Sequence, residues 1–129
     1  MQSAKRILLV EDDLDDQLFF TEALHNIHPN IQYEIANDGA EALLLVDSPP
    51  PFDMIFLDLN MPKVDGFECL QQLRALENYK KVPVIIVSTS TRVEDIDRCK
   101  NLGATTFFSK PSSFEKLFVQ LKGILASTL

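Results

Sequence analysis

The chain has 129 residues, of which 46% are hydrophobic and 24% charged, and its formal net charge is −7. This length suits a single domain with one sizeable core, and this composition argues against a disordered chain. The acidic balance argues against nucleic acid or an anionic membrane as a direct partner, because Lys and Arg bind phosphate groups.

Five short apolar runs along the chain have the length and composition of β-strands. The unbroken apolar character of most of them is typical of strands that are covered on both faces of a sheet. The second run alternates polar and apolar residues, which favours a position nearer a sheet edge. The predicted strands are residues 6–10, 31–36, 52–57, 83–87 and 105–109.

A helical pattern follows each predicted strand. The third helix begins at Asp65 and Gly66, and Gly103 ends the fourth. Pairs typical of helix N-termini are Asp38 with Glu41, Thr91 with Glu94 and Ser112 with Glu115. The first helix is predicted to bury one broad face made of Leu14, Leu18, Ala23, Leu24 and Ile27.

Alternation of strand and helix, repeated five times, predicts an α/β fold. Parallel strands joined by right-handed helical crossovers form a doubly wound sandwich. Because the alternation uses the chain from about residue 5 to 126, we expect a single domain over residues 1–129 with no output domain.

The cysteines and the N-terminus indicate the compartment. Cys69 and Cys99 share no metal-type spacing, so we expect reduced, buried thiols rather than a disulfide. The apolar run near the N-terminus is too short for a signal peptide, and no stretch approaches the length of a membrane span. We therefore expect a cytoplasmic protein.

Carboxylates follow the first and third predicted strands. In an open parallel sheet, ligands bind just outside the carboxyl ends of the strands. Asp58 ends the third run and is placed to be a nucleophile, since a carboxylate can hold a phosphoryl group as an acyl phosphate. Glu11 and Asp12, together with Asp58, would gather oxygen ligands around Mg²⁺, and the backbone carbonyl of Asn60 would add another.

A hydroxyl and an amine follow the fourth and fifth strands. Ser88 and Lys110 suit the oxygens of a transferring phosphoryl group. Taken singly, Ser88 is also explained as a turn hydroxyl and Lys110 as a solvated charge. Asp13, Asp15 and Asp16 are explained mostly by helix capping and the helix macrodipole. The convergence of four strand ends favours a phosphoryl-transfer site.

Four segments of the chain resemble the receiver domain of two-component response regulators. The resemblance covers nearly the whole chain and implies a flavodoxin-like fold, with a five-stranded parallel sheet of order 2-1-3-4-5 and five flanking helices. The segments are residues 7–13 (ILLVEDD), 57–66 (LDLNMPKVDG), 83–89 (PVIIVST) and 107–111 (FFSKP).

The resemblance also implies roles for the site residues. Asp58 would accept a phosphoryl group from a phosphohistidine on a sensor histidine kinase, in a reaction that requires Mg²⁺. Asp12 would bind the metal directly and Glu11 largely through water. Ser88 would be the switch hydroxyl and Lys110 the phosphate-binding lysine, preceding a cis peptide bond to proline. Such a protein catalyses only its own phosphorylation and dephosphorylation.

The chain departs mildly from the family pattern. Its acidic pair is Glu-Asp where Asp-Asp is commoner, and its switch hydroxyl is Ser rather than Thr. The aromatic switch position falls on Phe107, which lacks the hydroxyl of tyrosine. Phe107 either turns into the space that Ser88 vacates or is simply part of the core, and both interpretations stay open.

Phosphorylation of Asp58 adds charge and is expected to change the face formed by the fourth helix, fifth strand and fifth helix. The expected readout is a separate target protein or a histidine phosphotransfer protein. The same face is a candidate surface for a homodimer.

Three other functions share parts of this pattern. A hydrolase of the haloacid-dehalogenase type also uses a strand-end Asp and Mg²⁺, but it requires a second Asp where this chain has Asn60. A flavodoxin-like electron carrier would bind a flavin phosphate at the first turn, where residues 11–13 would repel it. The third alternative is a receiver that no longer accepts a phosphoryl group, and the complete set of site residues argues against it.

Overall fold

Five parallel strands alternate with helices in the computed structural model, which describes residues 5–61, 64–90 and 92–128. The strand order is β2-β1-β3-β4-β5, so the predicted doubly wound α/β fold and its 2-1-3-4-5 sheet are confirmed. The strands are β1 (Arg6–Val10), β2 (Gln32–Ala36), β3 (Met54–Asp58), β4 (Val84–Ser88) and β5 (Thr106–Ser109). The helices are α1 (Leu14–Ile27), α2 (Gly39–Val46), α3 (Gly66–Ala75), α4 (Val93–Asn101) and α5 (Phe114–Thr128), with a short 3₁₀ helix η1 (Glu77–Tyr79).

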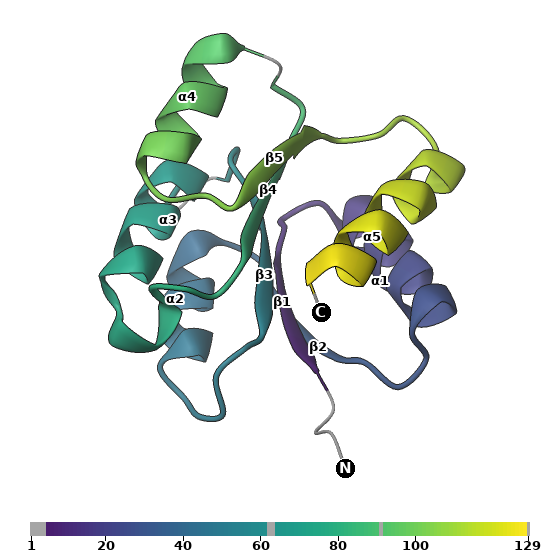
Figure 1. The fold of residues 1–129 in the computed structure, drawn as a ribbon, viewed down its shortest axis with the longest axis horizontal. Helices are drawn as coiled ribbons and strands as arrows, with labels where there is room; N and C mark the ends of the chain where they lie inside the picture. The colour runs from purple at the N-terminus through teal and green to yellow at the C-terminus, as the bar shows by residue number, and fades with distance from the viewer. Residues whose placement is uncertain (1–4, 62–63, 91, 129) are drawn as a thin grey trace.

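The sheet separates two hydrophobic clusters. Helices α1 and α5 cover one face, and α2, α3 and α4 cover the other (Figure 1). Successive residues of a strand point to opposite faces, so in β1 Ile7 and Leu9 join the α1–α5 cluster while Leu8 and Val10 join the other. Within the described ranges, no helix has the length and apolar character needed to cross a membrane.

The buried face of α1 differs from the prediction. Leu14 and Leu18 are 70% and 66% exposed, whereas Ala23 and Leu24 are buried as predicted and Phe20 is buried with them. A stripe at helical spacing runs back from Leu24 through Phe20 to Gln17, and Leu14 and Leu18 lie to one side of it. The packing of the Phe20 ring edge-on to Phe56, 4.8 Å between centroids, orients the helix.

Two predicted helix caps are confirmed. The Asp38 carboxylate accepts a hydrogen bond from the backbone N–H of Glu41 at 2.8 Å, and Asp65 accepts one from Glu68 at 2.9 Å. These bonds satisfy N–H groups that have no partner inside the helix. They fix the starts of α2 at Gly39 and of α3 at Gly66.

Of the two other predicted caps, Ser112 is wrong and Thr91 lies outside the residues that the structure describes. The predicted cap Ser112 is wrong, because α5 begins one residue later and Ser113 accepts the hydrogen bond from the N–H of Lys116 at 3.3 Å. Thr91 lies outside the described residues, and α4 has Arg92 at its N-cap without a side-chain hydrogen bond. The Lys110–Pro111 bond is trans, so the cis bond implied by the family resemblance is wrong.

Arg74 ties the end of α3 to the segments before β4 and β5. Its guanidinium donates to the carbonyl oxygens of Tyr79 at 2.7 Å, Val82 at 2.6 Å and Gly103 at 2.9 Å. Gly103 has φ +100°, in the left-handed region that favours glycine, and it ends α4 as predicted. Arg74 therefore holds the turn between α4 and β5 with neutral acceptors.

Candidate functional site

Four strands bring the predicted site residues to one edge of the sheet. Asp58 ends β3 and is paired in register with Val87, and Ser88 ends β4 opposite Ser109 of β5. Glu11 follows β1 directly and Lys110 follows β5. Parallel register thus places a hydroxyl, an amine and carboxylates from distant parts of the chain above the same edge.

Glu11, Asp12 and Asp58 form a group of carboxylates. Each offers an oxygen atom, and these oxygens lie within 4.8 Å of one another. Glu11 and Asp58 are each only 4% exposed, while Asp12 is exposed. Burial raises the pKa of Glu11 to about 7 and also raises the pKa of Asp58, against the opposing effect of Lys110. Burial therefore makes the charged forms of Glu11 and Asp58 costly, and a nearby cation lowers that cost.

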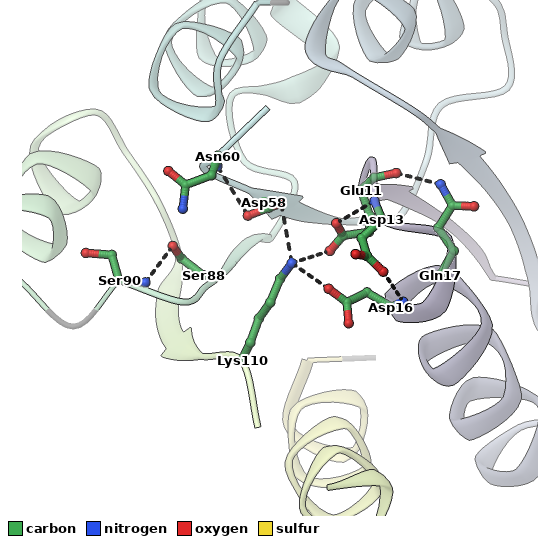
Figure 2. Close-up of polar contacts among 9 residues, drawn as sticks. All are labelled: Glu11, Asp13, Asp16, Gln17, Asp58, Asn60, Ser88, Ser90 and Lys110. Carbon is green, nitrogen blue, oxygen red and sulfur yellow. Dashed lines mark hydrogen bonds and ion pairs between the residues drawn. The ribbon is translucent and has the colours of Figure 1, made fainter. Parts of the chain in front are cut away.

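Lys110 is the cation of the site (Figure 2). Its Nζ lies 2.8 Å from Oε1 of Glu11, 2.9 Å from Oδ2 of Asp16 and 3.4 Å from Oδ2 of Asp58. Burial alone would lower the pKa of Lys110, but hydrogen bonds to Glu11 and Asp16 outweigh it and raise that pKa. Lys110 therefore stays protonated and faces three carboxylates at once.

Backbone and amide groups hold the buried carboxylates in place. Oδ1 of Asp58 accepts the N–H of Asn60 at 3.2 Å, and Oε2 of Glu11 accepts the N–H of Asp13 at 3.1 Å. Gln17 donates from its Nε2 to the carbonyl oxygen of Glu11 at 2.6 Å. The Asn60 residue is exposed, and it contacts Asp58 through its backbone N–H.

Ser88 is fully buried, and its hydroxyl is linked to α4. Its Oγ accepts the N–H of Ser90 at 3.1 Å, and the Ser90 hydroxyl donates to Asp95 of α4 at 2.6 Å. Phe107 is half-buried and packs against the hydrophobic cluster on the α2–α4 side of the sheet. Its packing suits the core interpretation, and its role in a switch stays a prediction.

Gly66 allows α3 to begin against the end of β3. A Cβ atom at this position would lie 2.4 Å from Cα of Leu59 and 2.5 Å from the carbonyl oxygen of Asp58. Both distances are far below van der Waals contact, so a side chain here would force the backbone beside Asp58 to move.

Two residues of the site were not identified from the sequence. The sequence explains Asp16 as an acid favoured at a helix start, yet its carboxylate contacts Lys110. Gln17 is buried and bonds both Glu11 and Asn37. The available signal was helical spacing, because both residues precede the buried Phe20 by about one turn and lie on the inner side of α1.

The chain resembles known proteins over nearly its whole length. A family model described as the response regulator receiver domain matches residues 7–122. Response regulator Rcp1 of Synechocystis sp. is 32% identical over 127 residues, which cover 93% of this chain and 86% of that protein. Stress response regulator protein 1 of Meyerozyma guilliermondii is 33% identical over 112 residues, which cover 87% of this chain and 51% of that protein. The chain thus spans about half the length of the second relative.

Solved structures have the same architecture. The phosphorylated cyanobacterial phytochrome response regulator RcpA superposes with a TM-score of 0.91 at 32% identity, covering 98% of this chain and 94% of that one. The Mn²⁺-bound form of response regulator Rcp1 gives a TM-score of 0.85 at 30% identity, covering 95% and 92%.

Proposed function

Because the chain belongs to the response regulator receiver domain family, which signals through phosphorylation, we propose that Asp58 accepts a phosphoryl group from a phosphohistidine of a sensor histidine kinase. The observation that carries this proposal is a strand-end carboxylate, 4% exposed, beside the Lys110 ammonium and two further carboxylates. An oxygen of Asp58 forms a bond to phosphorus while the bond between phosphorus and the imidazole nitrogen breaks. The products are an acyl phosphate and a histidine that takes up a proton.

The carboxylate group fits a hard divalent cation, and we propose Mg²⁺. Its donors are all oxygens, they lie within 4.8 Å of one another, and burial leaves their charge incompletely balanced. Glu11, Asp12, Asp58 and the backbone carbonyl of Asn60 would hold the ion. When bound, it would supply positive charge for the phosphoryl oxygens. The Mn²⁺-bound form of the similar Rcp1 supports a divalent cation in this type of site.

Ser88 and Lys110 are proposed to bind the phosphoryl group. Lys110 already points an N–H toward Asp58 and would donate it to a phosphoryl oxygen. The Ser88 hydroxyl would turn from Ser90 toward the phosphoryl group, which disturbs the hydrogen bonds from Ser90 to Asp95 in α4. Phe107 would then turn into the vacated space.

The readout is proposed to pass through the face formed by α4, β5 and α5. A local charge change at Asp58 biases the position of this face through Ser88 and Ser90. Its partner would be a downstream target protein or a histidine phosphotransfer protein, and the same face is a candidate homodimer surface. We also propose that the protein acts in the cytoplasm.

The test is the intact mass of the protein after incubation with acetyl phosphate, with and without Mg²⁺. We expect one phosphoryl adduct that requires Mg²⁺ and is lost in Asp58→Ala. Asp47→Ala, an exposed acid at the end of α2, is the matched control and keeps the adduct. Full labelling of Asp58→Ala would contradict the assignment of the acceptor.

Metal binding is measured independently of labelling, by calorimetric titration with Mg²⁺. Asp12→Asn should weaken binding about tenfold or more, because it removes one charged oxygen donor. Asp15→Asn removes the same charge from a nearby residue outside the proposed ligand set, so it should leave the affinity for Mg²⁺ nearly unchanged. Equal weakening by both variants would contradict the proposed ligand set.

A further inference from the structure

Three carboxylates match the three N–H groups of the Lys110 ammonium, and one of them lies outside the proposed metal ligands. Glu11 and Asp58 belong to the proposed metal site, but Asp16 comes from the first turn of α1. Its Oδ2 lies 2.9 Å from Nζ, within the range of charge-assisted hydrogen bonds. Figure 2 shows Lys110 between Asp16 on one side and Asp58 on the other.

The position of Asp16 is fixed by the start of α1. Its backbone N–H donates to Oδ1 of the N-cap residue Asp13 at 2.9 Å, and the N–H of Asp13 in turn donates to Glu11 at 3.1 Å. This short chain of hydrogen bonds connects the end of β1 to the first turn of the helix. Asp16 therefore offers its carboxylate from a rigid element rather than from a loop.

The distances divide the three acceptors of Lys110 into two kinds. The bonds to Glu11 and Asp16 are short, at 2.8 and 2.9 Å, and the contact with Asp58 is longer, at 3.4 Å. Two strong bonds fix an ammonium on a long flexible side chain and direct its third N–H at Asp58. That third N–H is the one available to a new oxygen on Asp58.

The surroundings strengthen the bond between Asp16 and Lys110. Both residues line a cavity of about 270 Å³ between α1 and α5, whose other walls include the rings of Phe19, Phe56 and Phe114. The Lys110 side chain is 17% exposed and that of Asp16 is 40% exposed. Apolar walls on one side reduce the competition from water for the ammonium.

We propose that Asp16 is a positioning residue for phosphoryl transfer. It holds the Lys110 ammonium so that one N–H meets the oxygen of the arriving phosphoryl group, and it does not touch the reacting atoms itself. This inference rests on the proposed acceptor function of Asp58. Without Asp16, the ammonium keeps its charge but loses one of the two bonds that orient it.

Asp15 is the matched control for this role. It lies in the same first turn and carries the same charge, but it is exposed and its side chain makes no hydrogen bond or ion pair to any described residue. Any general effect of an acid at the helix N-terminus is shared by both residues. A difference between Asp16→Ala and Asp15→Ala therefore reports the contact with Lys110.

The first measurement is the rate of phosphoryl uptake from acetyl phosphate at saturating Mg²⁺. Asp16→Ala should slow uptake about tenfold, and Asp16→Asn should fall between it and the natural protein, because the amide oxygen still accepts a weaker hydrogen bond. Asp15→Ala should stay within about twofold of the natural protein. Asp16→Asn preserves the shape of the side chain and keeps the test valid if Asp16→Ala folds poorly.

The second measurement is the reactivity of the Lys110 amine toward acetic anhydride, read by peptide mass relative to Lys116. Asp16→Ala should increase acylation of Lys110 several-fold, because one of the two short hydrogen bonds that hold the amine is lost, and Asp15→Ala should not. Uptake and acylation equal to those of Asp15→Ala would overturn the role of Asp16. A natural protein that takes up no phosphoryl group would instead count against the proposed function of Asp58, so the two failures are distinguishable.

Discussion

Glu11 is a weaker acid in the folded protein than in the unfolded chain. It is nearly inaccessible to water, and burial raises its pKa from an ordinary value of 4.5 to about 7. The pKa of Asp58 is also raised, by the same cause. Between pH 4.5 and about 7, Glu11 keeps a proton in the folded protein that it has already released in the unfolded chain. Folding therefore becomes less favourable as the pH rises through this range.

We predict that the free energy of unfolding falls by at most about 3 kcal/mol between pH 5 and pH 7.5 in the absence of divalent metal. Glu11→Gln removes the titrating group while keeping a similar shape, so its stability should fall less over the same range. Urea unfolding in the presence of a chelator measures both. Identical pH dependence of the two proteins would show that Glu11 is not the group responsible.

Candidate site residues were predictable because each follows a strand directly. Glu11, Asp58, Ser88 and Lys110 stand at strand ends, and the topology of a parallel sheet brings those ends together. Asp16 was not predictable in this way. Its partner Lys110 is 94 positions away, and local helix preferences already explain an acid in a first turn.

Gly66 constrains the junction between the end of β3, at Asp58, and the start of α3. Gly66→Ala would place a methyl group against the backbone of Asp58 and Leu59, and we expect it to destabilise the fold by more than about 2 kcal/mol. Gly123→Ala is the matched control in the exposed interior of α5, where a Cβ meets nothing within 4 Å. It should stabilise the protein by about 0.5–1 kcal/mol. Thermal and urea unfolding measure both, and effects of the same sign would contradict the assignment.

Arg74 joins three elements, and its loss should weaken them together. Arg74→Ala leaves the carbonyl oxygens of Tyr79, Val82 and Gly103 without the guanidinium, and we expect a cost of about 2–3 kcal/mol. Arg92→Ala removes an exposed arginine that pairs with Glu94 at 3.2 Å and should cost at most about 0.5 kcal/mol. Comparable losses of unfolding free energy in the two variants would sink the assigned role of Arg74.

Elements were predicted more closely than their orientations. Each observed strand lies within two residues of its predicted range, because unbroken apolar runs stand out in the sequence. The predicted buried face of α1 was wrong at Leu14 and Leu18, which are exposed, and the predicted cap of α5 was wrong by one residue. Spacing indicates that a helix has an apolar stripe, but its packing partners decide which stripe is buried.

At the scale of the whole molecule, the two thiols report on global opening. Cys69 in α3 and Cys99 in α4 are fully buried in the cluster on one face of the sheet. Burial raises the pKa of Cys69 to about 12 and that of Cys99 to about 11, so neither forms a thiolate at neutral pH.

We predict that neither thiol reacts with a disulfide reagent in the folded protein except through unfolding. Both should be modified at the same slow rate, and urea should accelerate the two equally. Mass spectrometry of each cysteine peptide over time measures the rates. Rapid modification of Cys99 alone would instead reveal local opening of α4.

The strand order decides which backbone groups are left for other chains. With β2 and β5 at the two edges of the sheet, their outer N–H and C=O groups are the ones that a foreign strand would pair with. Strand β5 is only four residues long and both of its ends are exposed, while β2 carries the charged Glu34 paired with Arg6. Short, polar edges discourage edge-to-edge aggregation, and the net charge of −7 adds repulsion between copies. Extension of the sheet from one copy into another is therefore disfavoured at either edge.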